Sequence, residues 1–280
     1  MAAGAGTGSL AVVSLVIAGI GVAQPYLYLV WQRFFRRGKL RFYPTGNVEV
    51  GYNQFGPLIG LAGALVASHR EMFVSGIDLT VVREGDNLTH RLDWWVFSHE
   101  IPLPAPGAEP SKVELAGGLM ILPTAPRRLS MAFVDFDTQR QMAPAMALAM
   151  EALTDADKEL GGLALVYSKR RGDPDATEYL ADLAQAVHAS RKHLNAHMAI
   201  NNAFYWQAGT YRATMRINTD RRDRWFGMTC RFTLSDSDEK KVRLNAVTIA
   251  DIALTEVTEG PGWQWFSAFA PYDDVQEASW

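Results

Sequence analysis

Residues 71–83 read Glu71-Met-Phe-Val-Ser-Gly-Ile-Asp-Leu-Thr-Val-Val-Arg83. From Ile77 to Val81 every second residue is apolar and the residues between are polar, a period of two that predicts a half-buried β-strand. The next run, His90-Arg-Leu-Asp-Trp-Trp-Val-Phe97, is rich in strand-forming residues, and residues 84–89 between the two runs are rich in turn formers. Two such runs around a turn predict an antiparallel hairpin. The sequence therefore indicates a mainly β fold.

The rest of the chain extends this pattern and interrupts it with helices. Residues 40–135 contain further strand-like runs, including the apolar and glycine-rich residues 56–66, which are too short to cross a membrane and are interpreted as a buried strand. An alanine-rich and methionine-rich segment then predicts a helix, and Asp173-Pro174 predicts the start of a second one that continues past Leu194. Strand patterning returns at 211–217, 225–234, 241–255 and 263–269.

We therefore expect an α+β, mainly β architecture. It consists of an N-terminal transmembrane helix and an antiparallel β-sandwich, immunoglobulin-like or arrestin-like in architecture, interrupted by a helical insertion at about 138–203. Two side-by-side domains are the alternative. The expected segments are a tail at 1–9, the membrane helix at 10–31, a basic juxtamembrane segment at 32–41 and the body at 42–280.

The membrane helix is predicted from an uncharged stretch. Residues 10–31 are mostly apolar and contain no charged side chain, and a helix of that length spans about 33 Å, enough for the hydrocarbon core of a bilayer. A cleaved signal peptide is the competing interpretation, but no positive charge precedes the run. Small residues at four-residue spacing favour weak pairing of two such helices, hence a homo-oligomer. They are Ser14, Ala18 and Val22, with Gly19 and Ala23 on a second stripe.

Charge predicts the orientation of this helix. All cations of the first 41 residues follow the apolar run, and they are Arg33, Arg36, Arg37, Lys39 and Arg41. Positive flanks stay on the cytoplasmic side, so the N-terminus is expected outside and the body in the cytoplasm. Without these five cations the 27 basic residues fall to 22 against 30 acidic ones, so residues 42–280 carry a net charge of −8. The basic segment is therefore expected to contact the membrane surface, whereas the acidic body does not suit nucleic acid.

Two histidines suggest a metal site. His193 and His197 are four residues apart on a predicted helix, so both can face one side and share a metal ion. The zinc-hydrolase pattern requires Glu after the first histidine, and Leu194 stands there instead. His188 is expected to point elsewhere. The alternative is a pair of surface histidines near a helix end.

Other candidate residues concern partner binding. Trp263 and Trp265 share one face of a predicted strand, which is either a binding surface or part of the core. A cationic loop, either solvated or in contact with an acidic partner, contains Arg221, Arg222 and Arg224. The single cysteine, Cys230, is expected to be a small buried residue, and neither a nucleophile elbow nor a phosphate-binding loop is present. The sequence thus predicts no catalytic residue and no cofactor.

These observations favour a non-enzymatic, membrane-anchored adaptor or assembly subunit. Its cytoplasmic body would bind another protein, since a membrane tether raises the local concentration of a weak binder. The first alternative is a membrane-tethered, metal-dependent hydrolase that uses His193 and His197. A module that binds glycans or envelope components is a further alternative, and it requires the body to face outward.

The topology is directly testable. We expect a reporter fused after Trp280 to be active only in the cytoplasm, because the cations after the apolar run hold that flank inside. Asn87-Leu-Thr89 is a formal glycosylation acceptor. Sugar on Asn87, or a reporter active only in the oxidising exterior compartment, would contradict the predicted orientation.

Overall fold

A computed structural model describes Tyr26 and residues 38–98, 113–220, 225–260 and 265–279. The strands are β1 (Lys39–Pro44), β2 (Asn47–Asn53), β3 (Gly56–Ser68), β4 (Met72–Arg83), β5 (Thr89–Ser98), β6 (Val113–Leu115), β7 (Leu119–Ile121), β8 (Arg127–Val134), β9 (Gly209–Thr219), β10 (Trp225–Leu234), β11 (Ala268–Pro271) and β12 (Asp273–Ser279). The helices are α2 (Phe136–Glu159), α3 (Ala164–Tyr167), α4 (Pro174–Ala189), α5 (Arg191–Ala203), α6 (Asp236–Thr248), the 3₁₀ helix η1 (Ile249–Asp251) and α7 (Ile252–Thr258).

The described strands form one antiparallel sheet that curls nearly into a barrel shape, and their order in the sheet differs from their order in the chain. Its main path runs β11-β2-β3-β8-β5-β4-β9-β10-β12, and β1, β6 and β7 pair with β3, β5 and β4 beside it. β11 pairs with β2 at one end of the path and also lies against β10 near the other end. β1 likewise contacts β10, so the curled sheet brings its two ends together around one core.

Strict alternation along the strands fills that core. Ile77, Leu79 and Val81 of β4 are buried, as their period of two predicts. β3 shows the same alternation along its length, so the prediction of a buried strand at 56–66 is confirmed. Trp206 lies within this core and its indole Nε1 donates to the carbonyl of Gly51 at 3.0 Å, which satisfies the only polar atom of its side chain.

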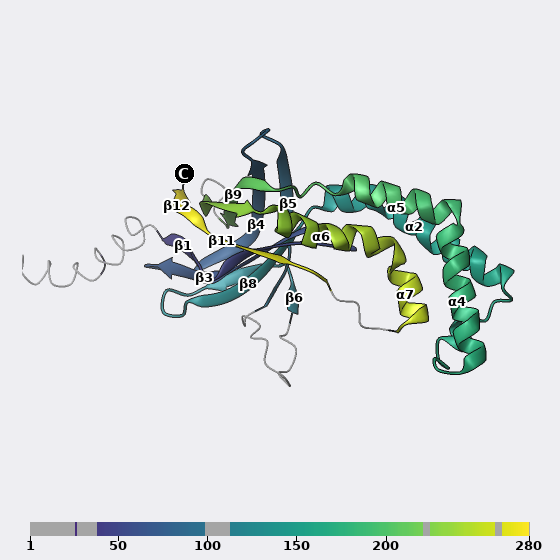
Figure 1. Cartoon of the computed structure of the whole chain (residues 1–280). Helices are drawn as coiled ribbons and strands as arrows, with labels where there is room; N and C mark the ends of the chain where they lie inside the picture. Colours follow the sequence, from purple (N-terminus) through teal and green to yellow (C-terminus); the bar gives the residue numbers. More distant parts are fainter. Residues whose placement is uncertain (1–25, 27–37, 99–112, 221–224, 261–264, 280) are drawn as a thin grey trace, which may run out of the picture.

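The helices form an arm at one end of the sheet. We call residues 136–203 and 236–258 the helical arm. In Figure 1, α4, α7 and the far parts of α2 and α5 extend away from the end of the sheet opposite β1, whereas α6 begins against the sheet, where it contacts β2 and β11. The arm has an apolar cluster of its own, separate from the core of the sheet. The buried members of that cluster are Leu153, Ala156, Ala164, Leu180, Leu183, Val187 and Leu254. The outer part of the arm is therefore held together by packing between its own helices, whereas α2, α5 and α6 also contribute buried residues to the core of the sheet.

The predicted antiparallel β fold with a helical insertion is confirmed, since α2–α5 occupy 136–203. The hydrogen bonds join the described strands into a single curled sheet rather than into two separate ones. The finer prediction of an immunoglobulin-like or arrestin-like sandwich stays a prediction. The predicted membrane helix at 10–31 lies outside the described residues except for Tyr26. Among the helices that the structure describes, none is both long and apolar enough to cross a membrane.

The strand predicted at 241–255 is wrong. This segment forms α6, η1 and the start of α7. Ser235 caps α6 through a reciprocal capping box with Asp238, and acidic residues fill the first turn. The buried Val242, Ala246 and Ile249 follow at the spacing of a helix face. The strand predicted at 263–269 is confirmed only from Ala268, where β11 begins, and residues 263 and 264 lie outside the described part of the chain.

Two glycines provide a stability test of the sheet. A Cβ added to Gly227 in β10 would lie 1.8 Å from the backbone oxygen of Met215 in β9, whereas a Cβ on Gly76 in β4 would meet no atom within 4 Å. We expect Gly227→Ala to lower the free energy of unfolding by about 3 kcal/mol, because the two backbones must separate. Gly76→Ala is the matched control and should change it by less than about 1 kcal/mol. Equal effects of the two variants in urea unfolding would contradict this pairing of β9 and β10.

Candidate functional site

The site begins with a break between two helices. α4 ends at Ala189 and α5 starts at Arg191, with Ser190 between them in an extended conformation (φ −67°, ψ 131°). In one continuous helix, His188 and His193 would be rotated about 140° from each other. The break changes the direction of the chain and allows both side chains to face the same neighbour.

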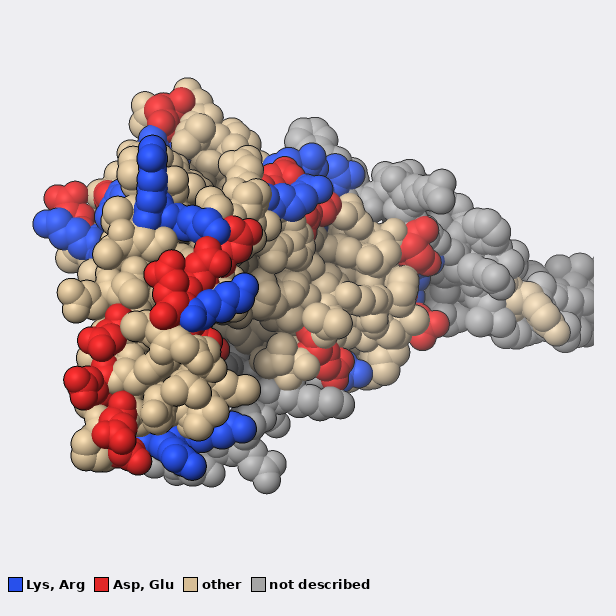
Figure 2. All heavy atoms as spheres, turned by 90° about the vertical axis from the view of Figure 1, so that its right-hand side faces the viewer, with Lys and Arg blue, Asp and Glu red and all other residues tan. Residues whose placement is uncertain are grey.

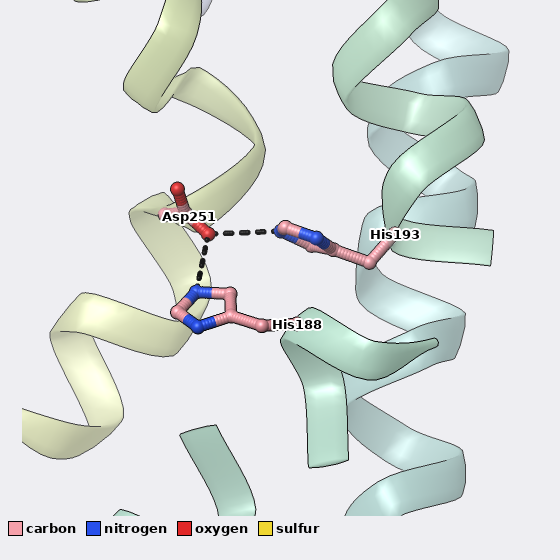
Figure 3. A group of neighbouring side chains, drawn as sticks. All are labelled: His188, His193 and Asp251. Atoms are coloured by element: carbon pink, nitrogen blue, oxygen red, sulfur yellow. Dashed lines mark hydrogen bonds and ion pairs between the residues drawn. The ribbon is translucent and has the colours of Figure 1, made fainter. Parts of the chain in front are cut away.

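That neighbour is Asp251, the last residue of η1. The Nε2 atoms of His188 and His193 lie 3.1 and 2.8 Å from the same carboxylate oxygen, Oδ1 of Asp251. The two imidazole centroids are 5.3 Å apart, and Figure 3 shows both rings turned toward the carboxylate. One ligand atom from each residue lies within 4.8 Å of the others. We call these three residues the His-His-Asp cluster.

The cluster is half enclosed. The side chain of His193 is 6% exposed, that of Asp251 26% and that of His188 55%. Nδ1 of His193 is buried and has no hydrogen-bond partner among the described residues. Next to His193, Lys192 forms ion pairs with Glu151 and Asp155 of α2 at 3.1 and 2.8 Å, which holds α5 against α2.

This geometry differs from the predicted metal pair. His193 belongs to the cluster, but His197 does not: its Nδ1 lies 3.2 Å from Nδ2 of Asn201, one turn along α5. The expectation that His188 points elsewhere is wrong, because it assumed an unbroken helix. Ser190 is a residue type that commonly starts helices and was the available signal for the break. Asp251 was missed because its segment was interpreted as a strand.

The other predicted site residues are only partly described. Arg41 of β1 forms an ion pair with Glu277 at 3.2 Å, and a hydrogen bond with Tyr43 together with the charge of Glu277 raises its pKa. Lys39 is exposed at the start of β1, and Trp265 is exposed before β11. The residues outside the described part of the chain are Arg33, Arg36, Arg37, Arg221, Arg222, Arg224 and Trp263. Their predicted contacts with lipid or partner stay predictions.

Cys230 is buried on β10, as predicted. Burial raises the pKa of its thiol to about 12. A thiol with such a pKa is protonated at neutral pH and is a poor nucleophile.

A second polar cluster lies where the sheet meets the arm. Oδ1 of Asp135 accepts hydrogen bonds from the backbone N–H groups of Asp137 and Thr138, both at 3.0 Å, which caps α2. Oδ2 of Asp135 lies 3.8 Å from Nδ1 of His90 on β5, whose ring stacks on Tyr205 at a centroid distance of 3.4 Å. Burial opposes ionisation of Asp135, but hydrogen bonds from His90 and Thr138 outweigh it, so the pKa of this carboxyl is lowered.

Two surface hollows are lined by residues that belong to neither cluster. The larger, of about 530 Å³, is lined by Glu84, Arg212, Thr214, Thr229, Arg231, Asp274 and Gln276. Its two arginines both form ion pairs with Glu84, at 2.8 and 2.5 Å, so their charge is compensated within the protein. The smaller, of about 280 Å³, lies over β4 and β5 beside Asp78 and Asp93. Neither of these two hollows is lined by a residue of the His-His-Asp cluster.

The sequence matches no protein-family model, and no curated protein and no solved structure is significantly similar to it. The function is therefore inferred from the geometry and chemistry of the side chains.

The lowered pKa of Asp135 predicts a pH-dependent stability. A carboxyl whose pKa is lower in the folded chain stabilises the fold above its unfolded pKa of about 3.9, and this contribution is lost as the pH falls through the folded value. We expect Asp135→Asn to lower the free energy of unfolding at pH 7 by about 1 kcal/mol, because the amide keeps the cap on α2 but removes the charge that strengthens the hydrogen bonds to this side chain.

At pH 3 the difference between Asp135→Asn and the unchanged chain should shrink, since protonation of the carboxyl in the unfolded chain already removes part of its contribution. Asp137→Asn, in the exposed first turn of the same helix, is the control and should have the smaller effect at pH 7. Urea unfolding at both pH values measures these differences. An Asp135→Asn effect that is the same at pH 7 and pH 3 would show that the charge of this carboxyl contributes nothing.

Proposed function

We propose that the chain is a single-pass membrane-anchored, non-enzymatic adaptor whose body lies in the cytoplasm and binds another protein through its helical arm. The observation that carries this proposal is an exposed apolar surface on α5. Leu194 and Met198 are 53% and 63% exposed, and they stand one turn apart on the same side of the helix. In this proposal the curled sheet is the scaffold that holds the arm.

The neighbouring helix also exposes apolar side chains. Leu244 and Val247 are exposed on α6, which packs beside α5. We call Leu194, Met198, Leu244 and Val247 the arm surface. The opposite side of α5 is already covered, since Ala196 and Ile200 are buried against the rest of the protein. Exposed leucine and methionine side chains on a helix are the kind of surface that another helix or an apolar groove covers.

The charges on the arm support a protein partner. Figure 2 looks onto the end of the arm and shows acidic and basic side chains interspersed, with uncharged surface between them. A surface that binds nucleic acid concentrates positive charge in a patch or stripe. The net charge of −8 on residues 42–280 has the wrong sign for such a partner.

The position of the arm also supports tethered binding. β1 lies at the end of the sheet opposite the arm, and the predicted membrane helix precedes β1 in the chain. An anchor at residues 10–31 would therefore leave the arm pointing away from the bilayer, accessible to partners. The tether would raise the local concentration of the arm surface, so that a modest affinity suffices for recruitment.

The two alternatives receive less support. The predicted metal-dependent hydrolase uses His193 and His197 as ligands, and the structure groups His193 with His188 and Asp251 instead. A glycan-binding or envelope-binding module would rely on Trp263 and Trp265 in an outward-facing body. Of these two residues, Trp265 is exposed and Trp263 lies outside the described residues.

The arm surface can be tested by crosslinking in the native membrane. The double variant Leu194→Glu with Met198→Glu keeps good helix formers and places charge on the apolar surface. We expect it to lose at least tenfold of the crosslinked partner, because two carboxylates would have to be buried in the interface. The matched control, Leu115→Glu, changes a 75% exposed leucine on β6 and should retain the partner.

Equal folding of the variants is checked by circular dichroism and thermal unfolding. A partner that both the double variant and Leu115→Glu retain in full would contradict binding through the arm surface. A pull-down with the intact chain that never enriches any protein would contradict the adaptor function itself.

A further inference from the structure

The His-His-Asp cluster joins three helical segments at one point. His188 lies in the last turn of α4, His193 in the first turn of α5 and Asp251 at the end of η1. His193 and Asp251 are 58 residues apart in the sequence. α5 packs against both α4 and η1, and α4 also contacts α7, so the convergence of the three side chains depends on the packing of several helices of the arm.

The chemistry of the three groups suits a divalent metal ion of the zinc class. Two imidazole nitrogens and one carboxylate oxygen form a common ligand set of Zn²⁺, which binds such atoms at about 2.0–2.2 Å. Adjacent ligand atoms around a tetrahedral ion are then about 3.3 Å apart. In the structure the two nitrogen-to-oxygen distances are 3.1 and 2.8 Å, and the three ligand atoms lie within 4.8 Å of one another.

Only small movements separate this arrangement from a coordination sphere. The two nitrogens point at one oxygen, so an ion placed among the three atoms requires each to move by less than about 1 Å. His188 can make this movement because its side chain is 55% exposed at the end of a helix. Without an ion, the same atoms are held by hydrogen bonds from the imidazole N–H groups to the carboxylate, which keeps the three ligands near their positions.

We propose that His188, His193 and Asp251 bind one Zn²⁺-class cation that fastens α4, α5 and η1 together. A water molecule would complete the coordination, since His188 and Asp251 reach the surface. The ion would hold the arm together, because its three ligands come from three separate helical segments. This proposal does not depend on the adaptor function, because it concerns only the ligands and the helices that carry them.

The decisive measurement is zinc binding by the full-length chain without a histidine tag. After removal of metal with a chelator, we expect isothermal titration with ZnCl₂ to show one saturable site and the thermal unfolding temperature to rise with added zinc. His188→Ala should weaken binding at least tenfold and abolish the rise in unfolding temperature. His188 is the suitable ligand to remove because its side chain is largely exposed, so the substitution removes little of the packing within the arm.

His197→Ala is the matched control, since it removes a histidine of the same helix outside the cluster. It should leave the zinc affinity and the shift in unfolding temperature unchanged. Asp251→Asn gives a second variant, which keeps the shape of the side chain and removes the charge of the ligand. It should also weaken binding at least tenfold.

Three results would overturn the proposal. The first is the absence of saturable zinc binding by the intact chain. The second is binding that neither His188→Ala nor Asp251→Asn weakens, and the third is binding that His197→Ala weakens as much as these two. Cobalt provides an independent readout, because visible absorption from a four-coordinate Co²⁺ should appear with the intact chain and be lost with His188→Ala.

Discussion

The arrangement of sheet and arm depends on a buried carboxylate at their junction. Asp135 directly follows β8, caps the first turn of α2 and faces His90 on β5. His90 in turn stacks on Tyr205, in the segment that leads from α5 back to β9. One side chain thus connects the strand that enters the arm, a neighbouring strand and the segment that leaves the arm. A buried charge is tolerated only when it is paired and hydrogen-bonded, so these three parts are held in fixed relation.

The junction is reinforced by aromatic side chains on the sheet. The hydroxyl of Tyr52 on β2 donates to Sδ of Met142 at 3.0 Å and lies 3.4 Å from the carbonyl of Ile200, so it contacts both α2 and α5. Burial raises the pKa of this hydroxyl, so it stays a neutral donor across the physiological range. Trp206 adds a bond to the carbonyl of Gly51 in the same strand. The arm is therefore attached by directional bonds as well as by apolar packing.

The sequence was informative where one face of an element is buried at a regular period. The alternation around Ile77 and the cap at Asp173-Pro174 both correspond to elements of the structure, β4 and α4. At 241–255 the same method failed, because this segment mixes β-branched and apolar residues and only the capping box at Ser235 distinguishes a helix. The curled closure of the sheet depends on contacts between β10, β1 and β11, which are distant in the chain and have no local signal.

The candidate site shows the same limit and its physical reason. Spacing along a helix identified His193 but paired it with His197 instead of His188. The reason is that a single residue, Ser190, ends α4 and starts α5. The orientation of α5 that follows has two consequences at adjacent positions. His193 faces Asp251 inside the arm, and Leu194 faces solvent on the arm surface. A rotation of α5 that separated His193 from Asp251 would also turn Leu194 and Met198 away from their present direction. The contact of His193 with Asp251 and the packing of α5 on α2 therefore hold the proposed binding surface in one direction.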